Sequence, residues 1–544
     1  MNEEQFHVEG QIVDIINQQT YPGRIVVKNS KIKAIEPINE APEKYIMPGF
    51  IDAHIHIESS LLVPSEFARL AVPFGTIATV SDPHEIGNVL GIDGVRYMIE
   101  NGEKVNFKFY FGAPSCVPAT PFETAGDEID LQGVEELLND NRVKFLAEMM
   151  NWPGVLNDDP LVMSKIAAAK NAGKPVDGHA PGMKGDQAFE YIRRGITTDH
   201  ECFTEEEAID KMNHGMFVQI REGSAAKNFE ALYKLLNNHP LQMMLCSDDK
   251  HPDNLITGHI DALVRRAVAN GIDVYNVLWA ACVNPVNHYN LDVGLLNEGD
   301  PADFIVVDDL QDFNVLQTYI NGEMVAENGK SMISSPPVKP VNKFAARRKN
   351  ISEFELEAKS EKINVIEALD GELVTNRIVV DAKIENGHVV SDPANDILKL
   401  VVVNRYEDVP PAIGFIKNIG LRKGAIASSV GHDSHNITAV GADDESLAKA
   451  VNLVIENKGG LSVVTENEEH VLSLPVAGLM SDKDGYWVAN EYTKLDKLSR
   501  EMGSTLNAPF MTLSFMALLV IPSIKLSDKG LFDGDKFEFI DVFA

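Results

Sequence analysis

The stretch MPGFIDAHIHIE, residues 47–58, decides how the rest of the sequence is interpreted. Residues 50–58 are predicted to form a β-strand, and His54 and His56 lie two positions apart within it. Side chains two apart on a strand project from the same face. If this is the first strand of a (β/α)₈ barrel, that face looks into the barrel mouth at the carboxyl end, where such folds place their active sites.

The sequence that follows has the alternation of strands and helices expected of such a barrel. Short apolar strand candidates recur at intervals of about 20 to 35 residues, and amphipathic stretches fill several of the gaps. Eight strands are predicted: 50–58, 76–85, 107–115, 143–149, 175–180, 196–201, 217–223 and 243–249. The fold class is therefore predicted to be α/β, with a (β/α)₈ TIM-like barrel over residues 47–289.

The flanking sequence predicts two further domains. Residues 1–46 and 290–335 share short Ile/Val-rich strands and Asn-Gly or Pro-Gly turns, which favour one small split β-sandwich. The stretch 336–350 is rich in Pro, Lys and Arg and is expected to be a linker. Residues 351–544 mix strand-like and helical runs, so a separate C-terminal α+β domain is expected.

Composition narrows the classes of function. The 544 residues contain 48 Lys and Arg against 81 Asp and Glu, a formal charge of −33, which disfavours nucleic acid and anionic membrane as partners. The four cysteines include no CxxC pair, and the N-terminus lacks the features of a signal peptide. The longest apolar run, 510–521, is too short to span a membrane. We therefore expect a cytoplasmic protein that acts on a small molecule.

Histidines and carboxylates recur at the predicted carboxyl ends of the barrel strands. The set consists of His54, His56, Glu148, His179, His200 and Asp248. Any one of them is explained as a polar residue at a strand end, but six at one end of a barrel are not explained by packing. Four imidazoles and two carboxylates suit Zn²⁺, Mn²⁺ or Fe²⁺. Glu148 could bridge two ions, and Asp248 could bind one metal and accept the proton of an attacking water.

These motifs resemble those of the amidohydrolase superfamily and, more narrowly, those of the bacterial adenine deaminases. The superfamily marks are MPGFIDAHIHIE (47–58), the strand-end residues and EGDPADFIVVDD (298–309). The narrower marks are SDPHEIGNV (81–89), YFGAPSCVPATPFE (110–123), AEMMNWPGV (147–155), DGHAPG (177–182), TTDHE (197–201), LCSDDKHPDNL (245–255) and VGHDSHN (430–436). The resemblance covers essentially the whole chain.

The resemblance implies hydrolytic deamination of adenine to hypoxanthine and ammonia, a purine-salvage reaction, in a homodimer. It also implies a binuclear centre of Mn²⁺ or Fe²⁺ on the six strand-end residues, with Glu148 bridging and Asp248 shuttling the proton. Asp82 either holds or protonates the purine or is a turn residue before Pro83. Two neighbouring pairs are candidates for substrate contact or for salt-bridged loops: His84 with Glu85, and Arg221 with Glu222.

Several alternatives stay open at this stage. The pair His56 and Glu58 matches half of the cytidine-deaminase zinc signature, but the PCxxC half is absent. Hydrolysis of a cyclic amide is disfavoured because the fourth strand ends at Glu148 rather than at a lysine. A scaffold that has lost its ligands is disfavoured because none of the six is missing. His432 and His435 flank Asp433 in a loop that either caps the active site or buries polar groups in a turn.

Overall fold

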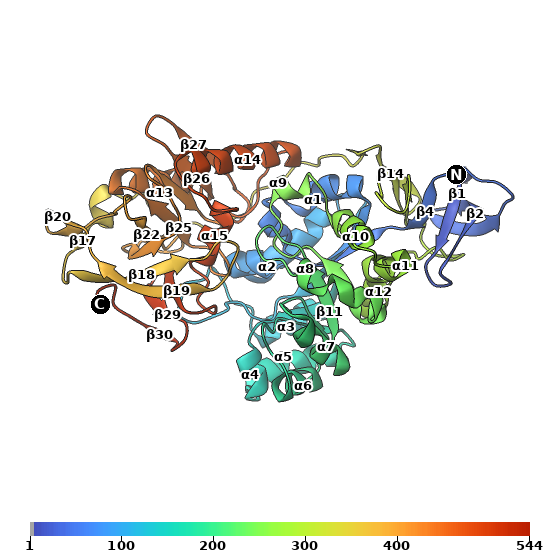
Figure 1. The fold of residues 1–544 in the computed structure, drawn as a ribbon, viewed down its shortest axis with the longest axis horizontal. Helices are drawn as coiled ribbons and strands as arrows, with labels where there is room; N and C mark the ends of the chain where they lie inside the picture. The colour runs from blue at the N-terminus through green and yellow to red at the C-terminus, as the bar shows by residue number, and fades with distance from the viewer. Residues whose placement is uncertain (1–4) are drawn as a thin grey trace.

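The molecule is elongated and has three parts. A computed structural model describes residues 5–544. Figure 1 shows a sheet that contains the N-terminal strands at one end, a barrel region in the middle and the C-terminal part at the other end. Segments far apart in the sequence therefore meet at two places, one on each side of the barrel.

The barrel contains all eight predicted strands. They are β5 (Phe50–Ile55), β6 (Thr76–Ser81), β7 (Lys108–Ala113), β8 (Val143–Met149), β9 (Val176–Gly178), β10 (Thr198–Asp199), β11 (Phe217–Arg221) and β12 (Met243–Cys246). Strands β5 to β9 pair in sequence order, as do β10 to β12, and every pair is parallel. The ring closes where the Asp248 N–H donates to the His54 carbonyl at 2.9 Å. The predicted fold class is confirmed.

Helices follow most of the strands, and several begin at clear capping residues. The Thr204 side chain accepts from the Glu207 N–H at the start of α7, and Asp159 caps α5 ahead of a proline. The helices around the barrel are α1 (Pro64–Ala71), α2 (His84–Gly102), α3 (Leu131–Asn139), α5 (Pro160–Asn171), α6 (Asp186–Arg193), α7 (Glu205–Asn213), α8 (Phe229–Leu232), α10 (Ile260–Ala269), α11 (Val274–Leu278) and α12 (Asn284–Tyr289). Two short helices, α4 (Trp152–Leu156) and α9 (Pro252–Leu255), lie in loops.

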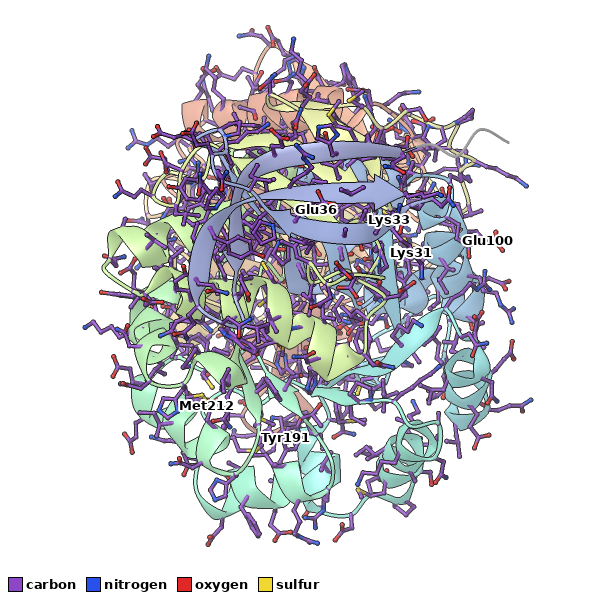
Figure 2. All side chains as sticks on the ribbon, turned by 90° about the vertical axis from the view of Figure 1, so that its right-hand side faces the viewer. Lys31, Lys33, Glu36, Glu100, Tyr191 and Met212 are labelled. Atoms are coloured by element: carbon purple, nitrogen blue, oxygen red, sulfur yellow. The ribbon has the colours of Figure 1, made fainter. Side chains whose placement is uncertain are left out.

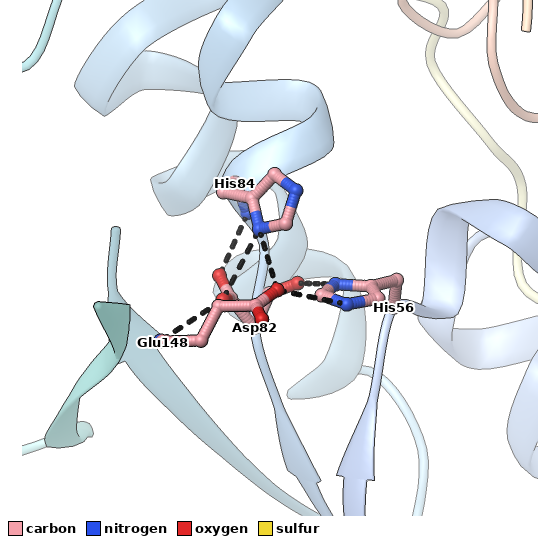
Figure 3. A group of neighbouring side chains, drawn as sticks. All are labelled: His56, Asp82, His84 and Glu148. Carbon is pink, nitrogen blue, oxygen red and sulfur yellow. Dashed lines mark hydrogen bonds and ion pairs between the residues drawn. The ribbon is translucent and has the colours of Figure 1, made fainter. Parts of the chain in front are cut away.

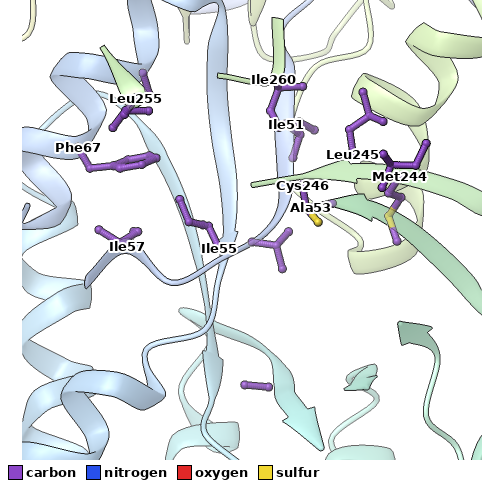
Figure 4. Close-up of a cluster of buried hydrophobic side chains, with 14 of the residues drawn as sticks. Ile51, Ala53, Ile55, Ile57, Phe67, Met244, Leu245, Cys246, Leu255 and Ile260 are labelled. Atoms are coloured by element: carbon purple, nitrogen blue, oxygen red, sulfur yellow. The ribbon is translucent and has the colours of Figure 1, made fainter. Parts of the chain in front are cut away.

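Along strand β5, apolar side chains that pack in the core alternate with polar side chains. Its alternate residues Ile51, Ala53 and Ile55 belong to the large buried apolar cluster that also contains Phe67 of α1 and Ile260 of α10 (Figure 4). The residues between them are polar, and His54 faces the barrel mouth. Because side chains alternate along a strand, the packing of one set fixes the direction of the other.

The N-terminal strands and a later segment build one eight-stranded sheet, in the order β16-β15-β14-β13-β4-β1-β2-β3. Its strands are β1 (Gln5–Asp14), β2 (Gln19–Lys28), β3 (Lys31–Pro37), β4 (Tyr45–Pro48), β13 (Phe304–Val307), β14 (Val315–Ile320), β15 (Glu323–Glu327) and β16 (Lys330–Ser331). Edge strand β3 exposes Lys31 and Lys33 (Figure 2) and buries Ile32 between them. Lysines on an edge strand disfavour pairing with another chain.

Residues 332–350 form neither helix nor strand and lead to the C-terminal part. Its main sheet has the order β19-β18-β23-β22-β25-β24-β26-β27. These strands are β18 (Lys362–Ala368), β19 (Thr375–Asp381), β22 (Ile397–Val403), β23 (Ala412–Lys417), β24 (Ala425–Ser428), β25 (Ile437–Gly441), β26 (Gly460–Val464) and β27 (Glu469–Ser473). Smaller strands are β17 (Leu356–Glu357), β20 (Ile384–Glu385), β21 (His388–Val389), β28 (Ile524–Ser527), β29 (Gly530–Asp533) and β30 (Glu538–Phe539). The helices are α13 (Asp444–Glu456), α14 (Gly485–Glu501) and α15 (Pro509–Phe515).

The apolar run at 510–521 forms nearly all of α15 and then continues as turns whose residues line the barrel mouth. Within residues 5–544, none of the helices has the length and apolar character needed to cross a membrane.

A buried lysine ties together the strand ends that carry His179 and His200. Lys211 of α7 is 1% exposed, and its Nζ donates to Asp199 Oδ2 at 2.9 Å, Glu207 Oε1 at 2.8 Å and the Ala180 carbonyl at 2.6 Å. We expect Lys211→Ala to lower the unfolding free energy by roughly 3–5 kcal/mol, because it leaves two buried carboxylates unpaired. The thermal midpoint measures this. In the matched control Lys449→Ala, at an exposed pair, the midpoint should barely move; equal shifts in both variants would contradict the role of Lys211.

Candidate active site at the barrel mouth

The six strand-end residues predicted from the sequence converge on one point. Five are buried, and His179 is partly buried. They come from or directly follow five different strands: His54 and His56 at β5, Glu148 in β8, His179 after β9, His200 after β10 and Asp248 after β12. In the part of the chain that the structure describes, two trios drawn from them, His54–Glu148–His200 and His54–His56–Asp248, place their ligand atoms within 4.8 Å of one another.

Glu148 lies at the centre of this group, and its two oxygens face different histidines. Oε1 is 3.2 Å from His56 Nε2, whereas Oε2 is 2.9 Å from His179 Nδ1 and 3.5 Å from His200 Nε2. Burial alone would raise the pKa of Glu148, but hydrogen bonds to His179 and His56 hold that pKa well below its usual range. The carboxylate is therefore ionised and divides the histidines into two groups.

Asp248 completes the group from the opposite side. Its Oδ1 lies 3.2 Å from His56 Nε2 and 3.6 Å from His54 Nε2, and Arg221 donates to its Oδ2 at 2.6 Å. Its φ of 54° is in the left-handed region, which aspartate tolerates better than most residues. Burial opposes ionisation, but the Arg221 guanidinium and the hydrogen bond with His56 keep the pKa of Asp248 well below its usual value.

Asp82 and His84 support the group from strand β6 and helix α2 (Figure 3). The Asp82 Oδ1 accepts the His84 N–H at 3.0 Å, its Oδ2 accepts the Glu148 N–H at 3.3 Å, and His84 Nδ1 lies 3.1 Å from Oδ2. The Asp82 carbonyl lies 3.1 Å from His56 Nδ1. A proton on that nitrogen leaves Nε2 of His56 as a free lone pair, the form in which histidine binds a metal.

The cavity above these residues is walled by two parts of the chain. It measures about 50 Å³, and its polar side carries His84, Glu148, Arg221 and Asp248. The C-terminal part supplies the other wall: Leu373, His432, Asp433, Phe515, Leu518, Val520 and Ile521. Several of the same residues also line a wider outer cavity of about 640 Å³, which adds Trp152 and Phe203. Both cavities thus lie between the barrel and the C-terminal part.

The remaining predicted residues fall in different places. His84 and Arg221 line the cavity, but the Arg221 guanidinium is already paired with Glu201 and Asp248. Asp82 and Glu85 are buried and are not among the residues that line the cavity. Glu222 is not among the residues that line the cavity, and its Oε1 accepts from Arg266 at 2.7 Å, which corresponds to the salt-bridged alternative.

Two charged cavity residues were missed from the sequence. Glu201 directly follows His200, with Oε1 3.4 Å from His179 Nδ1, and Asp249 directly follows Asp248. The signal was present in the motifs that contain them, TTDHE and CSDD. Both lie at strand ends, where the chain turns into a loop and consecutive side chains can face the same space.

The fold and the donors together define a metal-dependent hydrolase of the amidohydrolase type. Clustered imidazoles and carboxylates are the donors that divalent transition metals prefer, so the residues present fit such an ion. The profile of the amidohydrolase family matches residues 45–325, and that of the adenine deaminase C-terminal domain matches residues 372–538. The chain belongs to the adenine deaminase family within this class.

Full-length relatives support this membership. A protein of Sulfurovum sp. named adenine deaminase is 57% identical over 530 residues, which cover 97% of this chain and 98% of the relative. Another of that name from Methanosarcina mazei is 53% identical and covers 98% of this chain and 99% of its own. A solved β-aspartyl dipeptidase from Fervidobacterium islandicum covers 60% of this chain and 98% of its own, at 15% identity and a TM-score of 0.46.

The donor set predicts that a divalent ion stabilises the fold. An ion that binds only the native state adds about 2.7 kcal/mol at a concentration 100 times its Kd. We expect Mn²⁺ to raise the thermal midpoint of chelator-treated protein, and His54→Ala to reduce that rise. The control His7→Ala removes an exposed histidine whose side chain is 58% exposed. An equal Mn²⁺ response in His54→Ala and the parent protein would contradict a role for His54 in metal binding.

Proposed function

We propose that the protein catalyses the hydrolytic deamination of adenine to hypoxanthine and ammonia, a reaction of purine salvage. The observation that carries this proposal is the similarity to proteins named adenine deaminase along nearly the whole of both chains. The gathering of all six candidate ligands in one cavity supports it. A homodimer is proposed on the family resemblance.

The proposed metal ligands are His54, His56, Glu148, His179, His200 and Asp248. Glu148 is the proposed bridge between two ions, Mn²⁺ or Fe²⁺, because its two oxygens face different histidines. The bound ions would supply an activated water as the nucleophile and polarise the reacting centre.

The chain's own residues then move the protons. Asp248 is ionised, so Oδ1 can accept a proton from the attacking water while Arg221 holds Oδ2 in place. Attack forms a bond from the water oxygen to C6 of adenine and moves the electron pair of the C6=N1 π bond to N1. When Asp248 returns the proton to the exocyclic nitrogen, that pair re-forms the C6=N1 bond, the exocyclic C6–N bond breaks and ammonia leaves, which gives the hydroxy tautomer of hypoxanthine. Asp82 does not reach the cavity in this scheme; it orients His84, which faces the substrate.

The C-terminal wall completes the proposed binding site. Phe515, Leu518 and Ile521 give apolar surface that a flat purine ring can contact. The same residues exclude bulk water from the reacting atoms, which strengthens the electrostatic interactions there. On this view the domain division is functional as well: residues 47–289 carry the chemistry, and residues 351–544 close the cavity over it.

Incubation of Mn²⁺-loaded protein with adenine tests the reaction. Release of ammonia together with the absorbance change of the purine is the expected result. Adenosine, cytosine and guanine are the comparison substrates, and turnover of one of these without turnover of adenine would overturn the assignment. A metal-free preparation controls for contaminating deaminases.

Two isosteric variants separate metal binding from proton transfer. Glu148→Gln should lower the bound metal below two ions per chain, because an amide cannot bridge as a carboxylate does. Asp248→Asn should retain metal and lose roughly 10²- to 10⁴-fold in kcat. Metal analysis and steady-state kinetics measure both effects. Glu135→Gln and Asp93→Asn, at exposed positions, are the matched controls; near-normal kcat in Asp248→Asn would refute the shuttle.

A further inference from the structure

The loop 430–436, with the sequence VGHDSHN, brings polar residues of the C-terminal part to the barrel mouth. Asp433 and His435 have φ values of 67° and 54°, in the left-handed region that non-glycine residues seldom adopt. Such a backbone persists only when its surroundings determine it. The contacts of this loop therefore show what holds it.

Glu85 of helix α2 holds the loop through three contacts. Its Oε1 lies 3.0 Å from His432 Nδ1, and its Oε2 lies 2.7 Å from His435 Nε2. Oε2 also accepts the Asp433 backbone N–H at 3.1 Å. Glu85 is 2% exposed. Both of its oxygens are thus used to fix the loop, and neither is left for substrate.

The consequence is that the Asp433 side chain is presented to the cavity. Asp433 is 2% exposed and lines the cavity, and its Oδ1 lies 3.6 Å from His84 Nε2. Its Oδ2 is buried and has no hydrogen-bond partner. Among the cavity-lining carboxylates of residues 5–544, Asp433 is the one with such an oxygen. A buried acceptor without a partner is costly, so its presence points to a donor that arrives with a ligand.

A cation is a poor candidate for that ligand. Among the described residues, His84, Glu85 and Asp433 are close enough to hold one. Glu85, however, is already saturated by the loop, which leaves one imidazole and one carboxylate. A neutral N–H donor that enters the cavity from solvent satisfies Asp433 without disturbing the loop.

We propose that Asp433 accepts a hydrogen bond from the imidazole-ring N–H of the purine and thereby selects the free base over its nucleoside. This assignment rests on the proposed function. His84 spans the gap between Glu148 and Asp433, with Nδ1 3.6 Å from Glu148 Oε1. A purine whose six-membered ring faces the metal ligands presents its five-membered ring to the far wall, where Asp433 lies. A nucleoside carries a glycosidic bond in place of the N9 proton, so it leaves the buried carboxylate unpaired.

The test compares two inhibitors that differ in that proton. Hypoxanthine retains the imidazole-ring N–H, and 9-methylhypoxanthine lacks it. Inhibition of adenine turnover by each is measured for Mn²⁺-loaded full-length protein and for Asp433→Asn, an exchange that suits a left-handed backbone. We expect Asp433→Asn to raise the inhibition constant of hypoxanthine about tenfold, as for loss of a hydrogen bond to a charged group. The inhibition constant of 9-methylhypoxanthine should not change. Glu85→Gln, which loosens the loop, should show the same split.

Controls make the outcomes distinct. Glu407→Gln, an exposed carboxylate of the same part of the chain, should change neither inhibitor. If Asp433→Asn weakened inhibition by both compounds equally, or weakened inhibition by neither, the assignment of Asp433 would be overturned. Adenine turnover by the parent protein would still support the proposed function in that case. Loss of one metal equivalent in Asp433→Asn would instead make Asp433 a metal ligand. Failure of the parent protein to deaminate adenine would overturn both proposals.

Discussion

The closing contact of the barrel, the hydrogen bond from the Asp248 N–H to the His54 carbonyl, is the constraint on which the candidate site depends. It joins the first strand to the last and sets Asp248 against His54 and His56, almost 200 residues earlier in the chain. Without closure, the two ends of the sheet would carry an incomplete set of donors. Because the strands are parallel, closure also brings Glu148, His179 and His200 to the same end. The geometry of the donors is thus a property of the whole ring.

The cavity is lined by two parts of the chain, and the ring of donors belongs to only one of them. The barrel contributes the polar floor, and the C-terminal part contributes an apolar wall together with the loop 430–436. Glu85 connects the barrel to the C-terminal part, because it belongs to helix α2 of the barrel and its carboxylate contacts three groups of that loop. A neighbouring polar contact, from Ser434 Oγ to Glu123 Oε2 at 2.9 Å, reinforces the junction. The position of the wall is therefore fixed by buried polar contacts as well as by apolar packing.

Much of this could be predicted from the sequence, and the reasons for the exceptions are physical. The strand count and the six donors follow from local patterns, because a period of two in a strand fixes which side chains share a face. The same rule accounts for the different positions of Arg221 and Glu222: Arg221 lines the cavity, whereas the residue that follows it pairs with Arg266 outside the lining. The contributions of Phe515 and Ile521 could not be predicted, because they lie in a segment whose apolar character suits any core. Only the packing of the C-terminal part on the barrel brings them to the cavity.

The barrel and the C-terminal part line different sides of the cavity, and this bears on which part determines the reaction and which determines the choice of substrate. Under the proposed function, the donors at the strand ends bind the metal and set the type of reaction, so a change in any of them alters the chemistry itself. The wall meets the part of the substrate remote from the reacting carbon, where a change alters which molecules fit. Under the assignment of Asp433, the choice between base and nucleoside depends on a loop outside the barrel, positioned by a carboxylate within it. A buried polar group then discriminates more sharply than apolar shape alone, because the wrong substrate leaves that group without a partner.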